Sequence, residues 1–165
     1  MVWVYFDASA LAKRYAAEPG TPAVNELFRL VPAGKMQCSL LGMLEIISIL
    51  VRKRNDGRLS PELYAQASAD LDDEIMKRKV VELTSVDDAL VRTAASMILK
   101  HNLNATDAVV LHSALQSRQI IAASAENCFL CAADKRLNRA AQLEGIATLD
   151  PEIETEQSLK RLLGV

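Results

Sequence analysis

Short unbroken apolar runs alternate with longer helical patterns along this chain, and this alternation restricts its fold more than any other feature. The runs that predict β-strands are VWVYF (2–6), KMQCS (35–39), VVELT (80–84), CFLCAA (128–133) and IATLD (146–150). Strands without polar alternation are typical of a parallel sheet that is covered on both faces. The sequence therefore predicts an α/β fold, with helices on both faces of a five-stranded parallel sheet.

Helical patterns occupy the segments between and after these runs. The predicted helices cover residues 8–18, 21–30, 40–51, 61–79, 85–101, 104–117, 134–144 and 151–164. Residues 118–124 (RQIIAAS) fit either an extension of the preceding helix or a short strand. No repeat, low-complexity segment or linker divides the 165 residues. We therefore expect one domain over residues 1–165, in which residues 151–165 form a helical tail.

Composition narrows the classes of function. Half of the residues are apolar and the formal net charge at pH 7 is −2, so the chain is expected to fold and to have no global attraction to nucleic acid. Binding to a polyanion would require local basic clusters or metal ions. The first residues form no basic leader, the apolar stretches are too short to span a bilayer, and there are three cysteines. These features predict a cytoplasmic protein without a membrane contact.

Two of the cysteines, Cys128 and Cys131, form a C-x-x-C motif. In a redox enzyme such a pair opens a helix, where the helix dipole lowers the thiol pKa. Here the motif falls on a predicted strand, and residues three apart on a strand point to opposite faces. No second pair of cysteine or histidine residues completes a zinc site. Buried apolar thiols are the favoured interpretation.

A single carboxylate, Glu45, lies within the apolar stretch LLGMLEIISILV (40–51). A buried charge without a partner is strongly unfavourable, so Glu45 needs a cation, a proton or a water-filled cleft. Three further acids lie where functional groups gather in an open parallel sheet, at the carboxyl ends of strands. Asp7 follows the first strand, Asp134 follows the fourth strand, and Asp107 lies in the first turn of a helix.

These four carboxylates have routes to one rim of the sheet. Clustered carboxylates repel one another unless a cation holds them, and Mg²⁺ prefers oxygen ligands. Each acid also has a simpler interpretation. Asp7 and Asp134 suit helix caps, Asp107 suits the helix dipole, and Glu45 suits an exposed position.

Four segments together resemble the PIN-domain ribonucleases, and especially the VapC toxins of toxin–antitoxin pairs. They are VYFDASALAKRY (4–15), LLGMLEIISIL (40–50), NATDAVVLHSAL (104–115) and FLCAADKRLNRAAQLEG (129–145). The resemblance runs from the first strand to about Asp150. It implies a single PIN-like domain whose parallel sheet has the strand order 3-2-1-4-5.

The resemblance also implies an activity: a Mg²⁺- or Mn²⁺-dependent endoribonuclease. The acidic residues at the motif positions, which would bind metal and support catalysis, are Asp7, Glu45, Asp107 and Asp134. Ser9 matches a supporting hydroxyl of the family, and Thr106 is a second candidate for support. Hydrolysis of a phosphodiester needs a metal ion to lower the pKa of bound water and to offset charge on the phosphoryl oxygens. The implied products carry a 5′-phosphate and a 3′-hydroxyl.

Basic residues near the motifs are candidates for contact with RNA phosphates. They are Lys135, Arg136, Lys13 and Arg14, and a further cluster is formed by residues 52–54 with Arg58. Lys135 and Arg136 are favoured because they follow an acid of the candidate site. Exposed, solvated helix surface is the alternative for all of them. His101 and His112 are assigned structural roles.

Two other functions compete with the toxin hypothesis. One is a phosphohydrolase that uses Asp7 as a nucleophile, although Ser9 occupies the position at which such phosphatases usually carry a second Asp. The other is a non-catalytic PIN-like module that binds RNA or protein. Under the toxin hypothesis the partners are an RNA substrate, a small antitoxin and a second copy of the chain. Apolar residues such as Leu27, Phe28 and Leu30, or the helix predicted at 61–79, are candidates for the protein contacts.

Overall fold

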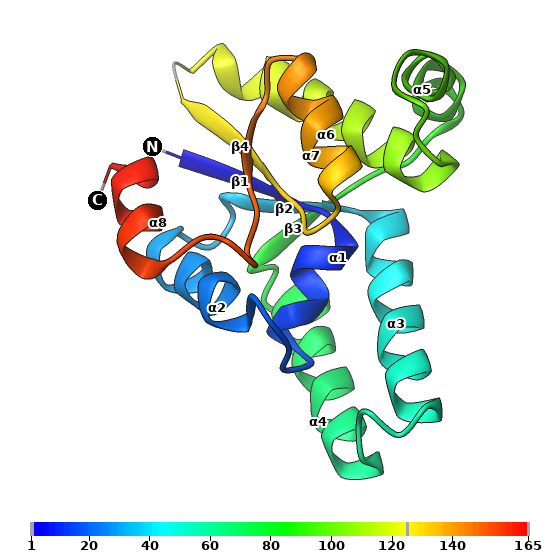
Figure 1. Ribbon diagram of the computed structural model, residues 1–165, viewed down its shortest axis with the longest axis vertical. Coiled ribbons are helices and arrows are strands. Elements are labelled where there is room, and N and C mark those ends of the chain that lie inside the picture. The colour runs from blue at the N-terminus through cyan, green and yellow to red at the C-terminus, as the bar shows by residue number, and fades with distance from the viewer. Residues whose placement is uncertain (1, 125, 165) are drawn as a thin grey trace.

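Five parallel strands cross the centre of the molecule in the order β3-β2-β1-β4-β5 (Figure 1). The computed structural model describes residues 2–124 and 126–164. The strands are β1 (Val2–Phe6), β2 (Met36–Ser39), β3 (Val81–Thr84), β4 (Asn127–Cys131) and β5 (Ala147–Leu149). Both the parallel sheet and its order confirm the expectation from the sequence. β1 lies in the middle, between β2 and β4.

Helices cover both faces of this sheet. They are α1 (Ala8–Leu11), the 3-10 turn η1 (Ala12–Arg14), α2 (Thr21–Leu30), α3 (Leu40–Asn55), α4 (Pro61–Leu71), the π-helical turn η2 (Asp72–Lys77), α5 (Asp88–His101), α6 (Ala105–Ala122), α7 (Lys135–Leu143) and α8 (Glu156–Leu163). Figure 1 shows α5, α6 and α7 on one side of the sheet and α1 to α4 with α8 on the other. The molecule is a single α/β domain.

The strands β1 and β4 contribute alternate side chains to two separate cores. Val4 and Phe6 of β1 belong to the core beneath α1 to α4, whereas Tyr5 belongs to the core beneath α5 to α7. Cys131 and Cys128 of β4 divide in the same way, and both are buried and without a disulfide. The C-x-x-C pair therefore points to opposite faces, as expected for residues three apart on a strand.

Several helices differ in length from their predicted ranges; for example, the one predicted at 40–51 continues to Asn55 and the one predicted at 85–101 begins at Asp88. The helix predicted at 8–18 narrows to a 3-10 turn and ends by Arg14, because the Thr21 hydroxyl donates to the Lys13 carbonyl at 2.8 Å. The helix predicted at 61–79 widens into η2 after residue 71. In contrast, α6 continues to Ala122. The sequence allowed either a helix or a strand for residues 118–124. Residues 118–122 extend α6 and form no strand.

The segment after β5 completes the same domain. Its helix is restricted to Glu156–Leu163 and packs against α2. Leu159 and Leu163 are buried in the core beneath α1 to α4. The predicted helical tail is therefore shorter than expected, and its last residue, Val165, lies outside the described residues. Within residues 2–124 and 126–164, none of the helices has both the length and the apolar character for a membrane crossing.

Candidate active site

Asp7 directly follows the central strand β1 and is the first acid of the site along the chain. Its carboxylate accepts a hydrogen bond from the Ser9 amide at 2.9 Å and so caps α1. The residue is only 6% exposed. Burial raises the pKa of this carboxyl, contacts with Ser9 and Ala8 lower it, and the charge of Asp134 raises it further. Asp7 is therefore a cap and, at the same time, a carboxylate held at the carboxyl edge of the sheet.

Glu45 lies in the second turn of α3, which follows β2. Its side chain faces a cavity and not the core, which answers why an acid stands among apolar residues. Burial raises the pKa of Glu45 to about 7, and the charges of Asp7 and Asp107 act in the same direction. Arg52 and the Thr106 hydroxyl lower it. Glu45 thus changes its charge close to neutral pH.

Asp107 lies in the first turn of α6 and is held by Asn104, the residue that caps this helix. The Asn104 side-chain oxygen accepts from the Asp107 amide at 2.8 Å, and its side-chain amide donates to the Asp107 carboxylate at 2.9 Å. Burial raises the pKa of Asp107 to about 6, and Asp7 and Asp134 add to this effect. Asn104 is a site residue that was not predicted from the sequence. The sequence feature that could have indicated Asn104 is an Asn three residues before an Asp at the start of a predicted helix.

Asp134 follows β4 and caps α7. Its Oδ1 accepts from the amides of Arg136 at 2.7 Å and Leu137 at 3.0 Å. Within the described part of the chain, no hydrogen bond is found for Oδ2, which leaves that oxygen for the cavity. The capping role that the sequence suggested is therefore real, and it leaves one carboxylate oxygen available.

One cavity of about 210 Å³ brings the four acids together at the carboxyl ends of β1, β2 and β4. It is lined by Asp7, Ala8, Ser9, Glu45, Ser48, Ile49, Arg52, Asp107 and Asp134. Because they lie close together, the charges of these carboxyls raise the pKa values of Asp7, Glu45 and Asp107. The convergence expected from strand order thus occurs.

Ser9 connects two of the segments that carry acids. Its hydroxyl accepts from the Ala133 amide at 3.0 Å, which joins the start of α1 to the loop before Asp134. A contact of the same hydroxyl with Asp7 lowers the pKa of that acid. Asn138 supports this loop from α7, because its side-chain amide donates to the Ala132 carbonyl at 2.8 Å. Thr106, in turn, contacts Glu45 from the start of α6.

The basic residues proposed from the sequence separate into two groups. Lys13 is buried and forms ion pairs with Glu18 and Glu152. Arg14 forms an ion pair with Glu74, donates to Asn25 and lies over the Phe28 ring. Neither side chain lines the acidic cavity. Nearby acids are paired with both cations, so the structure disfavours the predicted contacts of Lys13 and Arg14 with RNA.

Lys135 and Arg136 are exposed at the start of α7. The charge of Arg136 lowers the pKa of Asp107, so this guanidinium lies near the acidic cavity. Lys135 instead lines a separate hollow of about 330 Å³ with Arg139 and Asp150. Of the four basic residues, Arg136 is therefore the one beside the acids.

The cavity suits a hard divalent cation. Its donors are carboxylate and hydroxyl oxygens, and burial with mutual repulsion raises the pKa of three of the acids. Over residues 2–124 and 126–164, no group of three or more acidic, histidine or cysteine side chains is arranged so that it could hold a metal ion by itself. Mg²⁺ fits such an open arrangement, because it usually binds through one or two carboxylates and keeps several waters.

The raised pKa of Glu45 predicts that its carboxylate destabilises the fold above neutral pH. Between the ordinary pKa of 4.5 and the folded value of about 7, the folded state binds more protons than the unfolded state. The free energy of unfolding therefore falls as the pH rises through this window. In metal-free buffer at pH 8, Glu45→Gln should raise Tm by about 2–4 °C, and this gain should vanish towards pH 4.

Thermal unfolding followed by circular dichroism measures this effect. Glu62→Gln is the matched control, because hydrogen bonds at the start of α4 lower the pKa of Glu62. The control should not raise Tm at pH 8. An equal Tm for Glu45→Gln and the natural chain at pH 8 would contradict the electrostatic description of the cavity.

The comparisons with known proteins concern the family and the fold of the chain. A family model described as PIN domain matches residues 4–143. Among solved structures, the crystal structure of PAE2754 from Pyrobaculum aerophilum is similar, with a TM-score of 0.65 and 18% sequence identity. That match covers 99% of this chain and 98% of the other chain, and at this identity it concerns the fold alone. No curated protein matches the sequence.

Proposed function

This chain belongs to the PIN-domain family, whose members are generally nucleases, and we propose that it is a metal-dependent endoribonuclease acting as the toxin of a type II toxin–antitoxin pair. The observation that carries the proposal is the set of four carboxylates around one cavity of about 210 Å³. A binding module has no need for such repulsion. Hydrolysis of a phosphodiester, by contrast, uses acids that hold Mg²⁺ or Mn²⁺.

Asp7 and Asp107 are the proposed metal ligands, directly or through water, with Glu45 and Asp134 completing the set. A bound Mg²⁺ would acidify water and offset negative charge on the phosphoryl oxygens. Ser9 and Asn104 act as positioning residues, because they hold Asp7 and Asp107 by hydrogen bonds. They therefore fix two carboxylates before the substrate arrives.

Glu45 is the proposed base for the attacking water. Its pKa of about 7 lies near the pH at which a general base works most efficiently. Thr106 contacts the same carboxyl and orients it. Attack by water in line with the leaving oxygen then breaks the bond to the 3′-oxygen, which leaves a 3′-hydroxyl and a 5′-phosphate. Arg136, beside Asp107, is the proposed contact to the RNA backbone on the α7 side.

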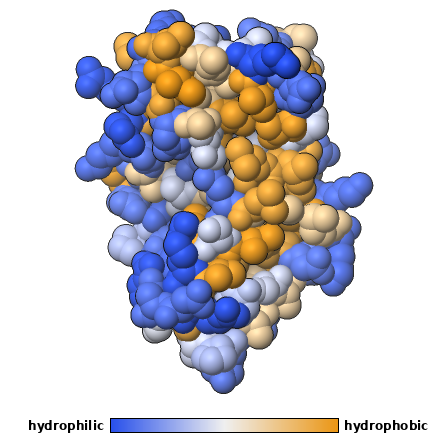
Figure 2. All heavy atoms as spheres, turned by 90° about the vertical axis from the view of Figure 1, so that its right-hand side faces the viewer, coloured by the Kyte–Doolittle hydropathy of each residue, from blue (hydrophilic) through white to orange (hydrophobic). Residues whose placement is uncertain are grey.

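A small antitoxin is the proposed protein partner. An apolar groove of about 310 Å³ lies between α3 and α4 and is lined mainly by Met43, Ile47, Leu50, Tyr64, Leu71 and Met76. Figure 2 shows apolar side chains gathered in a band over this side of the molecule. The proposed occupant of this groove is an apolar antitoxin segment, and the groove shares helix α3 with the acidic cavity. The candidates on α2 do not contribute, because Leu27 is buried and Phe28 and Leu30 pack against the core.

A homodimer is proposed through the exposed apolar residues of α5. Val91, Ile98 and Leu99 are 50%, 38% and 88% exposed. Light scattering across a dilution series measures this association, and a monomer at every concentration would contradict it. We place the activity in the cytosol, where reduced thiols such as those of the three cysteines persist.

The ends of the cleaved RNA test the proposed function. With Mg²⁺, purified protein should convert an end-labelled single-stranded RNA into fragments with 5′-phosphates and 3′-hydroxyls, because water is the nucleophile. The fragments are resolved on a denaturing gel before and after phosphatase treatment. Cyclic 2′,3′-phosphate ends would contradict the mechanism, since they require attack by the RNA 2′-hydroxyl. A covalent phosphate trapped on Asp7 would instead support the phosphohydrolase, and binding without cleavage would support the non-catalytic module.

A further inference from the structure

A second cavity of about 400 Å³ lies directly beside the acidic one. Both cavities are lined by Ser9, Ile49, Arg52 and Asp134, so these four residues form the boundary between them. The remaining wall of the second cavity is rich in charge and comes from η1, α3 and the segment after β5. A chain that binds in the acidic cavity can therefore continue into the second one.

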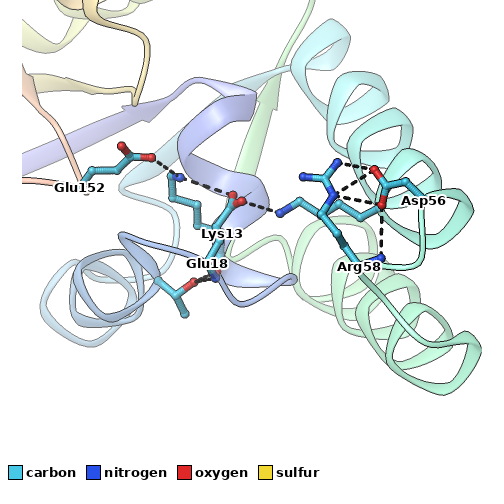
Figure 3. Close-up of polar contacts among 7 residues, drawn as sticks. Lys13, Glu18, Asp56, Arg58 and Glu152 are labelled. Atoms are coloured by element: carbon cyan, nitrogen blue, oxygen red, sulfur yellow. Dashed lines mark hydrogen bonds and ion pairs between the residues drawn. The ribbon is translucent and has the colours of Figure 1, made fainter.

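Most charges around the second cavity neutralise one another. Lys13 and Lys53 are both buried, and both bind Glu18; Lys13 also binds Glu152 at 2.8 Å. Figure 3 shows Lys13 lying between Glu18 and Glu152. These two lysines and two glutamates together carry no net charge. Because both lysines are paired with glutamates, neither ammonium group is available to bind a ligand.

The Arg58 guanidinium is neutralised as well. It donates from Nε and Nη2 to both oxygens of Asp56, at distances from 2.6 to 3.0 Å, as Figure 3 shows. The pair lies at the turn after α3, and both side chains are largely exposed. Arg58 therefore contributes little positive charge to the cavity.

Arg52 is different. It lies on α3 seven residues after Glu45, which is two helical turns and therefore the same face of the helix. Its Nη1 donates to the Ser48 hydroxyl at 3.2 Å. Within the described residues, Arg52 has no carboxylate at ion-pair distance, unlike the other three cations of the second cavity. An exposed guanidinium without a carboxylate thus stands at the boundary of the two cavities.

The geometry points to Arg52 as the binding site for the RNA phosphate next to the one that is cleaved, with the second cavity receiving the adjoining nucleotide. This inference rests on the proposed ribonuclease function. A guanidinium presents a planar fork of donors that matches two phosphate oxygens. Because the four acids repel a polyanion, an uncompensated cation at their edge is needed to hold the strand. Arg136 lies near Asp107 and offers a second cation to the same strand.

Arg52 has one other role open to it, which the experiment must separate from phosphate binding. The charge of Arg52 lowers the pKa of Glu45, so its removal could affect catalysis through that acid alone. In that case kcat would fall, and the pH midpoint of kcat would move upward. Loss of a phosphate contact, in contrast, affects KM and its dependence on salt.

Arg52→Ala is the test, with Arg54→Ala as the matched control. Arg54 lies on the same helix, but its guanidinium stacks over the Tyr64 ring and lines neither cavity. Cleavage of a single-stranded RNA of mixed sequence is followed with Mg²⁺ from low to high salt and across pH. Arg52→Ala should raise KM about tenfold, as expected for one charge-assisted contact, and leave kcat within about twofold. The slope of log kcat/KM against log salt should become shallower by about 0.7. Arg54→Ala should leave all three quantities unchanged.

Two results would overturn the inference: equal KM and salt slope in Arg52→Ala and the natural chain, or a fall in kcat with an upward shift of its pH midpoint. Arg52→Lys should fall between Arg52→Ala and the natural chain, because it keeps the charge and loses the fork. If the natural chain cleaves no RNA, the proposed function fails. Fluorescence anisotropy with the same RNA in chelator then still tests Arg52, because equal affinity and salt slope for the natural chain and Arg52→Ala would overturn the phosphate contact by itself.

Discussion

Replacing Asp7 by asparagine is expected to lower kcat/KM for RNA cleavage by on the order of 10³-fold while the fold stays intact. Asn keeps the shape of the side chain and an oxygen that can accept from the Ser9 amide, so the cap of α1 survives. The substitution removes only the negative charge at the centre of the cavity. Under the proposed mechanism a metal ligand is lost and, with it, the stabilisation that the metal gives to charge in the transition state, and losses of this size are usual for such groups.

Asp150→Asn is the matched control for this variant. Asp150 follows β5 as Asp7 follows β1, and its carboxylate likewise accepts a backbone amide, that of Glu152 at 3.0 Å. It does not line the acidic cavity. Single-turnover cleavage of end-labelled RNA measures both variants, and circular dichroism checks their folds. Undiminished cleavage by Asp7→Asn would remove Asp7 from the mechanism.

Removal of divalent ions is expected to stop cleavage completely. In excess chelator the four acids of the cavity, Asp7, Glu45, Asp107 and Asp134, repel one another without a cation between them. Among the described residues that line the cavity, Arg52 is then the one group with a positive charge to stabilise a phosphorane-like transition state. Addition of Mg²⁺ or Mn²⁺ beyond the chelator should restore the rate, because both ions accept oxygen ligands.

An equal ionic strength of KCl, added to the chelated protein, is the control for this experiment. It screens the same repulsion but supplies no ion that acidifies water, so the rate should stay at background. Cleavage is measured as loss of full-length RNA with time. If the rate in excess chelator equals the rate in Mg²⁺, the acids act without a metal and the proposed mechanism is wrong.

The strands could be predicted because each strand is a short apolar run without alternation, whereas their order was implied only by the resemblance to PIN-domain ribonucleases. VWVYF places Val4 and Phe6 in one core and Tyr5 in the other, and such a run is stable only when both faces are covered. Helix ends were less predictable. The end of the first helical segment depends on Thr21, whose hydroxyl donates a hydrogen bond to the Lys13 carbonyl. This contact forms only once the loop between them has folded.

The acids of the candidate site could be predicted from their positions, since Asp7 and Asp134 directly follow neighbouring strands. The cations could not. Lys13 and Arg14 stand beside Asp7 in the sequence, but Lys13 pairs with Glu152 and Arg14 with Glu74, which are far away along the chain. Whether a basic side chain is available to bind RNA depends on acidic partners that are distant in the sequence, and local sequence patterns do not indicate these partners.

The neighbours of β1 have a consequence for the synthesis of the chain. Asp7 emerges from the ribosome early, but β1 pairs with the distant strand β4, in the register Val2 with Asn127 and Phe6 with Cys131. The sheet around β1 is therefore incomplete until β4 has been synthesised. Domains generally fold during translation as their parts emerge, and contacts this distant in sequence form late. Asp134 emerges later still, just after β4. A nascent chain therefore carries an incomplete cavity for most of its translation, and the four acids can meet only once nearly the whole domain has been made.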